Sequence, residues 1–194
     1  MKKILPVSRM LLFVAAAIMI VTYFVPFWQI LMWAPQYPEG LTMKIWINTI
    51  TGDVDIINGL NHYIGMKHIK VEMFPEFKIM PYLVGGIILF GLITTLTARK
   101  FMVVAFFLIL VLTAIVGLYD FYQWGYDYGH NLDPTAPIKV PDMSYQPPLI
   151  GTKELLNFVA FSGPDTGGWI MVASGILTGI ALFLETFKNK TKKL

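Results

Sequence analysis

Four long apolar stretches are the feature that most constrains how this chain can fold. They cover residues 11–33, 79–98, 101–122 and 168–187, and each is close to the ~20 residues that a helix needs to cross ~30 Å of hydrocarbon. Of the residues, 56% are hydrophobic and only 14% are charged, which is unlike an ordinary soluble domain. The sequence therefore predicts an all-α integral membrane protein with four transmembrane helices in one membrane domain.

The charged residues indicate how these helices are oriented. Nine cations and one acid, Glu185, fall at the two ends of the chain and in the short link between the second and third stretches. Six cations and ten acids fall in the two longer connections, and the remaining acid, Asp120, lies near the outer end of the third stretch. Because Lys and Arg concentrate on the cytoplasmic side, both termini are predicted to be cytoplasmic. Loops 34–78 and 123–167 then face the periplasm of a bacterial inner membrane, and residues 188–194 form a cytoplasmic tail.

The first apolar stretch follows Lys2, Lys3 and Arg9, as the core of a signal peptide would. It continues well beyond the ~7–15 residues of such a core, and it ends in aromatic residues instead of a small-residue cleavage site. We therefore expect residues 11–33 to form a membrane anchor in a single helix.

The apolar stretches carry no ionisable side chain near their middle, where transporters and proton pumps usually place functional residues. Nucleotide-binding, esterase and zincin motifs are also absent from the sequence, so an enzyme is not expected. Gly175 and Gly179 form a G-x-x-x-G pair, interpreted as helix packing within the bundle, with a dimer face as the alternative. An aromatic belt is predicted at the outer membrane boundary, formed by Trp28, Trp33, Tyr119, Tyr122, Trp124 and Trp169.

The first loop is predicted to contain a small β-hairpin. Apolar and polar residues alternate over 41–48, Thr51-Gly52-Asp53 supplies a turn, and 54–57 is the expected return strand. A short helix capped by Asn58 or Asn61 should follow, with His62 and Met66 on one face.

The three histidines, His62, His68 and His130, all fall in the two outer loops. Imidazole binds copper, zinc, iron and nickel, and thioether sulfur favours Cu(I), so a mixture of His and Met points to copper when cysteine is absent. The predicted metal ligands are His62, Met66 and His68, and His130 could join them with Met73 or Met143. A structural or partner-docking role for the same residues stays open.

The second loop is rich in proline, which favours an extended segment lying across another surface. Its prolines are Pro134, Pro137, Pro141, Pro147, Pro148 and Pro164. Residues 152–161 are predicted to form a short amphipathic helix at the membrane interface. Membrane lipids and other membrane or periplasmic subunits are the expected partners. Nucleic acid is not expected, because the net charge is only +3.

The segments Trp33-Ala34-Pro35-Gln36-Tyr37-Pro38-Glu39-Gly40-Leu41 and Asp55-Ile56-Ile57-Asn58-Gly59-Leu60-Asn61-His62-Tyr63-Ile64-Gly65-Met66 carry a resemblance. Together with the four-span layout, they resemble small membrane proteins associated with bacterial nitrous oxide reductase gene clusters. The resemblance implies a part in assembling or supplying a periplasmic copper enzyme, and it brings no established catalytic residues.

The sequence therefore indicates one leading function and one alternative. The first is an accessory protein whose outer loops support maturation, copper supply or assembly of a copper enzyme. The second is a non-catalytic structural subunit of a larger membrane complex. A haem-linked subunit is least favoured, because the four stretches contain no histidine that could act as an axial ligand.

Overall fold

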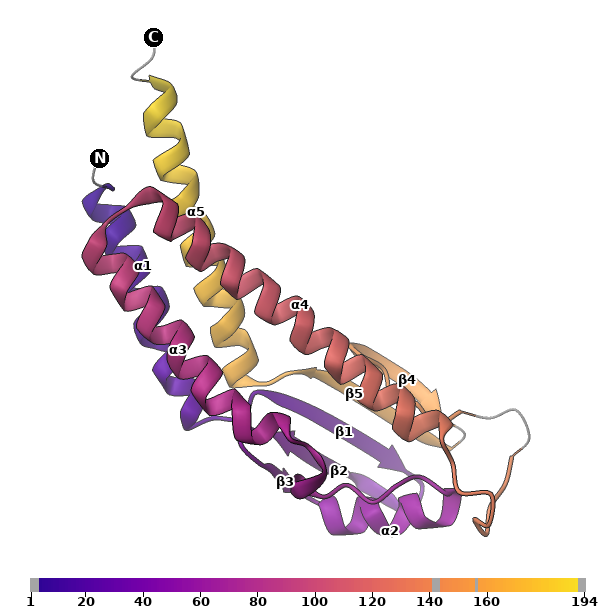
Figure 1. Cartoon of the computed structure of the whole chain (residues 1–194). Helices are drawn as coiled ribbons and strands as arrows, with labels where there is room; N and C mark the ends of the chain where they lie inside the picture. Colours follow the sequence, from indigo (N-terminus) through magenta and orange to yellow (C-terminus); the bar gives the residue numbers. More distant parts are fainter. Residues whose placement is uncertain (1–3, 141–143, 156, 192–194) are drawn as a thin grey trace.

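The computed structural model describes residues 4–140, 144–155 and 157–191, and it divides into a helical bundle and a sheet domain (Figure 1). The bundle contains α1 (Pro6–Ile18) continued by the 3-10 helix η1 (Met19–Tyr23), α3 (Glu76–Thr97), α4 (Lys100–His130) and α5 (Thr166–Thr191). Four helical segments are long and apolar enough to cross a membrane: Pro6–Tyr23, Glu76–Thr97, Lys100–His130 and Thr166–Phe187.

Small residues bring the helices of the bundle close together. A Cβ atom added at Gly91 of α3 would lie 2.7 Å from the Phe106 ring of α4 and 2.8 Å from Cβ of Ala16 in α1. In the G-x-x-x-G pair, Gly179 faces the Phe107 ring of α4 at 3.3 Å, whereas nothing lies within 4 Å of a Cβ added at Gly175. The bundle therefore uses one of these two glycines for internal packing.

The end of the bundle away from the sheet holds both termini and the turn between α3 and α4 (Figure 1). There the carboxylate of Glu185, only 4% exposed, accepts hydrogen bonds from the backbone N–H of Leu5 at 2.6 Å and from Ser8 Oγ at 2.7 Å. Arg9 donates to the carbonyl of Thr95 at 2.9 Å. A carboxylate at the start of α1 accepts a hydrogen bond from a backbone N–H that has no partner within the helix. It also interacts favourably with the positive end of the helix dipole.

The sheet domain overturns the prediction of an all-α protein and of a simple four-helix bundle. Its five antiparallel strands are β1 (Trp28–Ala34), β2 (Tyr37–Ile45), β3 (Ile50–Gly52), β4 (Gly151–Leu155) and β5 (Phe158–Pro164), in the order β3-β2-β1-β5-β4. Both long loops thus supply strands to one sheet. The central pair, β1 and β5, joins segments that lie more than a hundred residues apart in the chain.

The predicted first span, residues 11–33, was wrong because it merged a helix with a strand. The helical part ends at Tyr23, and β1 begins at Trp28 beyond Pro26. Both faces of β1 are apolar, with Ile30 and Met32 on one face and Leu31 on the other. A strand that is apolar on both faces cannot be separated from a membrane helix by hydropathy alone.

Two further loop predictions were wrong. The amphipathic helix predicted over 152–161 is a hairpin of β4 and β5, in which Thr152 pairs with Phe161 and Glu154 with Val159. In the first loop β2 does pair with β3, but as one edge of the larger sheet. The predicted return strand, 54–57, lies in helix α2 (Val54–Ile64). The β-branched and aromatic residues of 158–161 suit a strand that packs on a neighbour.

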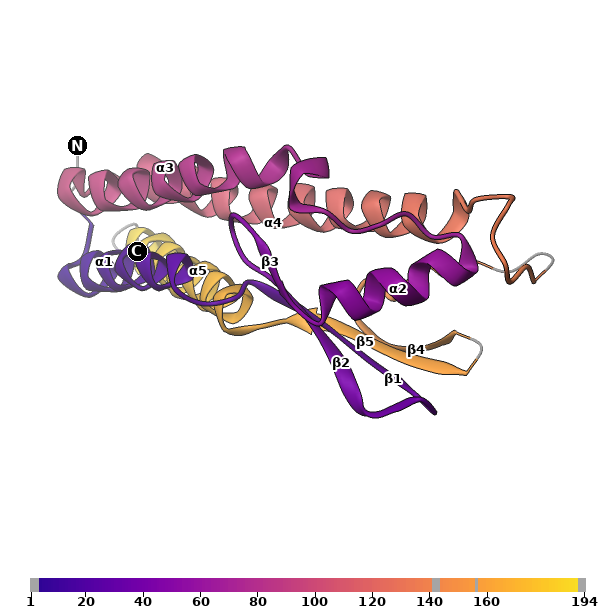
Figure 2. The ribbon, with the colours of Figure 1, turned by 90° about the horizontal axis from the view of Figure 1, so that it is seen from below.

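One face of the sheet is covered by α2, by the segment that follows it, and by the far end of α4 (Figure 2). The buried cluster on this face contains Ile30 and Met43 of the sheet, Ile57 of α2 and Tyr128 of α4, packed against Phe121 and Trp124. The 31 residues of α4 span about 46 Å at 1.5 Å per residue, so the helix is roughly ten residues longer than a ~30 Å hydrocarbon layer requires. The prediction that this helix ends at residue 122 was therefore too short.

The bundle and the sheet meet through a dense junction. The Phe27 N–H donates to the carbonyl of Ile45 at 2.7 Å, and the Gly167 N–H donates to the carbonyl of Pro26 at 2.8 Å. Lys44 forms an ion pair with Asp165, the residue between β5 and α5, at 3.6 Å. Short connections and shared hydrogen bonds fix the sheet relative to the helices of the bundle.

Candidate functional site: a pocket beside His62 and His68

The candidate site begins where α2 ends. Gly65 takes the left-handed conformation, with φ of 79°, and ends the helix. A Cβ atom at this position would lie 2.9 Å from the carbonyl oxygen of Asp133, so glycine allows both the turn and the close approach of the second loop. The Asp133 N–H donates to the carbonyl of Gly65 at 2.8 Å, and that of Ile138 donates to Tyr63 at 2.9 Å.

Two buried asparagines hold the chain beyond this turn. The side chain of Asn58 forms two hydrogen bonds with the backbone of Ile69, accepting from its N–H at 2.6 Å and donating to its carbonyl at 3.0 Å. Asn61 donates to the carbonyl of Lys67 at 3.4 Å. The predicted capping role of these asparagines was wrong, because both lie inside α2. They instead fix the segment that carries His68.

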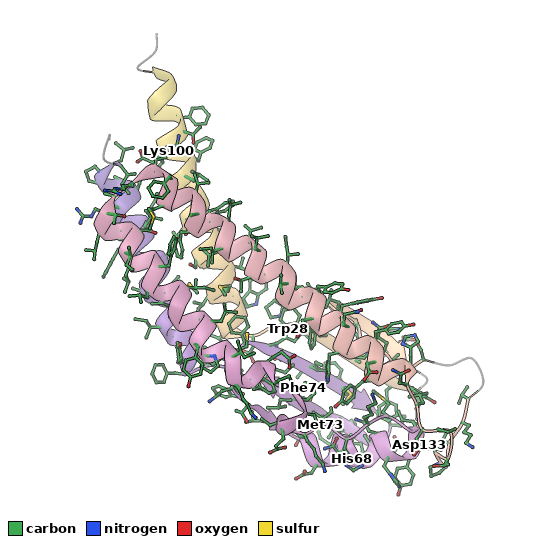
Figure 3. All side chains as sticks on the ribbon, viewed as in Figure 1. Trp28, His68, Met73, Phe74, Lys100 and Asp133 are labelled. Atoms are coloured by element: carbon green, nitrogen blue, oxygen red, sulfur yellow. The ribbon has the colours of Figure 1, made fainter. Side chains whose placement is uncertain are left out.

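The imidazole rings of His62 and His68 lie side by side, with centroids 6.3 Å apart and planes at 81°. They border an open pocket of about 380 Å³, also lined by Met66, Lys67, Asn131 and Asp133. Figure 3 shows His68 and Asp133 at the end of the sheet domain away from Lys100. Residues from both long loops therefore form one pocket.

An ion pair closes the side of the pocket next to α4. Lys67 Nζ lies 2.5 Å from Asp127 Oδ2, and Asn131 also donates to the Asp127 carboxylate. The hydrogen bond from Lys67, and then that from Asn131, lower the pKa of Asp127. Hydrogen bonds from Thr135 lower the pKa of Asp133, with a smaller effect from the nearby charge of His62. These hydrogen bonds favour the ionised form of both carboxylates; Asp133 borders the pocket, whereas Asp127 contacts it through Lys67.

The structure brings together some of the predicted ligands but not all of them. His62, Met66 and His68 border the same pocket. His130 instead stacks on Tyr126 at a centroid distance of 4.0 Å, with Nδ1 3.0 Å from the Tyr126 carbonyl oxygen. Its ring thus shares a face of α4 with Tyr126, whereas Asp127 and Asn131 bond to each other on another face. Met143 lies outside the described residues.

The distance between the two rings allows a shared ion. Two imidazoles on opposite sides of one metal ion, with metal–nitrogen bonds of ~2.0–2.1 Å, have ring centroids about 6.4 Å apart. The observed 6.3 Å is close to this limit. Among the described residues, no group of three or more His, Cys, Asp or Glu side chains could hold a metal ion. Two imidazoles and a thioether are a ligand set that suits Cu(I). At 6.3 Å the two rings match a nearly linear arrangement, so binding of the Met66 thioether to the same ion would require the rings to move closer together.

Sequence reasoning missed the contribution of α4 and the second loop to the pocket. Lys67 is a close neighbour of the predicted ligands in sequence, but Asp127, Asn131 and Asp133 are about 60 residues away. The available signal was the i, i+4 spacing of Asp127 and Asn131 after the third apolar stretch. That spacing indicates one face of a helix continuing beyond the membrane.

No family model and no curated protein matches the chain. The resemblance to proteins associated with nitrous oxide reductase clusters therefore stays a prediction. The function proposed below depends on the geometry of the pocket.

Proposed function

We propose that this chain is a non-catalytic inner-membrane accessory protein whose sheet domain, on the periplasmic side, binds Cu(I) transiently and passes it to a copper protein. The observation that carries this proposal is the pair of imidazoles, His62 and His68, whose ring centroids lie 6.3 Å apart beside Met66. Neutral imidazoles would supply two nitrogen ligands and Met66 a soft sulfur ligand.

The openness of the pocket supports transient binding and transfer of Cu(I) instead of its storage. Both histidines are exposed, and the ligand set is too small to enclose an ion. A partner could therefore add its own ligands to the same ion before removing it. Asn58 and Gly65 would keep the two imidazoles in place during this exchange, since they fix the chain on both sides of Met66.

Sidedness supports the periplasmic assignment. Arg99 and Lys100 lie in the turn between α3 and α4, at the end of the bundle away from the sheet. Cations concentrate on the cytoplasmic side of membrane proteins, so the sheet domain would face the periplasm.

The test is Cu(I) binding by the purified full chain in detergent. We expect about one Cu(I) per chain, and a loss of affinity of tenfold or more in His62→Ala and in His68→Ala, because a lost ligand costs more than ~1.4 kcal/mol. His130→Ala is the matched control, since its ring stacks on Tyr126 outside the pocket. Absence of binding in the parent chain, or equal affinity in all four proteins, would refute the proposal.

A non-catalytic structural subunit is the second candidate, favoured by a different observation. The face of the sheet opposite α2 carries the exposed side chain of Trp33. Purification of the native chain distinguishes the two functions. Stable co-purification with larger subunits and no bound copper would favour the structural role, whereas a copper-loaded chain without them would favour the accessory role.

A further inference from the structure

The face of the sheet turned away from α2 and α4 carries an apolar strip. We define this strip as Leu31 and Trp33 of β1 with Val159 and Phe161 of β5, which the strand register places side by side. None of these four side chains belongs to either buried cluster of the described residues, and Trp33 is 38% exposed. Figure 2 shows α2 and α4 on the other side of the sheet.

The two aromatic rings of the strip lie close to glycines. A Cβ atom at Gly40 would be 2.8 Å from Nε1 of Trp33, and one at Gly163 would be 2.9 Å from the Phe161 ring. Glycine on the exposed face of a sheet lets an aromatic ring cover the backbone. The strip is therefore an apolar surface on one face of the sheet, and such faces pack against the faces of other sheets.

We propose that the strip binds the same strip of a second copy of this chain, in a two-fold dimer whose axis is parallel to the membrane normal. Two copies in one membrane have the same orientation, so only an axis along the normal can relate them. The strands run away from the bundle in the general direction of α4 (Figure 1). The axis then runs along the strands, and the two sheets face each other.

The strand register makes the strip complementary to itself about this axis. Leu31 pairs with Phe161, and Trp33 pairs with Val159, across the β1–β5 ladder. Rotation about an axis over this ladder exchanges β1 and β5, so Leu31 of one copy faces Phe161 of the other, and Trp33 faces Val159. Each contact then joins a larger apolar side chain with a smaller one.

The flanks of the strip fit the same rotation. Thr42 of β2 is level with Leu31, and Thr152 of β4 is level with Phe161, so Thr42 faces Thr152 of the second copy. Within the described strands, the charged residues on this face are Lys44 and Glu154, one on each flank. Lys44 is level with Gln29, and Glu154 is level with Val159 and Trp33. The rotation therefore places Lys44 of one copy and Glu154 of the other on the same flank at different levels, and it brings no like charges together.

The natural absence of cysteine allows a direct test in native membranes. Facing Cα atoms of packed sheets lie ~10 Å apart, a distance that a short bismaleimide can cross. We expect the full chain with Thr42→Cys and Thr152→Cys to give a covalent species of twice the 22.0 kDa chain mass. Either single variant should stay at the monomer mass, because its two thiols lie on opposite flanks.

Matched variants decide the outcome. Thr42→Cys with Lys153→Cys moves one thiol to the other face of β4 and should give no covalent dimer. Adding Trp33→Lys to the productive pair should abolish the dimer, whereas Tyr63→Lys, which alters an exposed side chain outside the strip, should not. Three results would each overturn the proposal: only monomer from the productive pair, equal crosslinking in the control pair, or a crosslink to a different protein.

Discussion

The bundle and the sheet domain are packed by different means, although both are rich in apolar residues. The buried cluster of the bundle brings backbones together through small residues such as Ala15, Ala16 and Gly91. The cluster of the sheet domain is filled by large aromatic rings, among them Trp124 and Tyr128. Lipid offers no hydrophobic force between helices, so close contact replaces it. Water outside the membrane favours burial of large rings.

The largest effect is expected from removing a ring of the sheet domain. Tyr128 is 4% exposed and lies against Trp124 and Phe74, so Tyr128→Ala should lower the free energy of unfolding of this domain by about 3–5 kcal/mol. Denaturant unfolding followed by tryptophan fluorescence measures this. Tyr126→Ala, on the exposed side of the same helix, is the control and should have a small effect. Equal losses would show that the end of α4 does not pack on the sheet.

Adding a large side chain at a close contact between helices should destabilise the bundle. Gly91→Leu adds a side chain at a position where even a Cβ atom would lie 2.7 Å from the Phe106 ring. Overpacking of this kind typically costs about 1–3 kcal/mol. Gly86→Leu on the same helix enters open space and should be tolerated. Thermal unfolding of both variants in detergent measures the difference. Similar melting temperatures would contradict the close contact of α1, α3 and α4.

A smaller loss of stability is expected where hydrogen bonds hold a segment of the sheet domain. Asn58→Leu leaves the N–H and the carbonyl of Ile69 without their side-chain partners, at a cost of about 1–2 kcal/mol. Hydrogen exchange should become faster at the Ile69 amide and stay unchanged in α3. Unaltered protection of Ile69 would mean that other contacts hold the segment that carries His68.

The smallest effect concerns the pH dependence of the ion pair beside the pocket. The folded pKa of Asp127 is lowered by Lys67, so its contribution is present above the ordinary carboxyl pKa of ~3.9 and is lost as the pH falls through the folded value. Because both side chains are about two-fifths exposed, the contribution should stay below about 1 kcal/mol. Lys67→Met should therefore reduce stability more at pH 6 than at pH 2. An equal loss at both pH values would show that packing of the Lys67 stem matters instead of its charge.

The bundle could be predicted from the sequence far better than the sheet domain. Length and hydropathy are sufficient to find helices such as α3 and α5. They fail at β1 and β5, because Leu31 and Phe161 make the exposed face of the sheet apolar as well. Pairing between such distant segments depends on register, which neither segment reveals alone.

The candidate site was predictable only where its residues are close in sequence. His62, Met66 and His68 all lie within three residues of Gly65 in the sequence, so their types and spacing indicated a site. Asn131 and Asp133 reach the pocket only because α4 continues to His130 and the second loop returns to α2. The prediction of His130 as a ligand ignored its position on α4, where its ring stacks on Tyr126.

In the proposed topology, the sheet domain with its imidazole pair stands on the periplasmic side, opposite the cationic turn between α3 and α4. Labelling of single cysteines by a membrane-impermeant maleimide in spheroplasts tests it most directly. Gly59→Cys enters open space on α2, and Ile138→Cys samples the second loop. Both should react in intact spheroplasts, whereas Arg99→Cys should react only after lysis. Labelling of Arg99→Cys in intact spheroplasts, or of only one of the other two variants, would contradict the account.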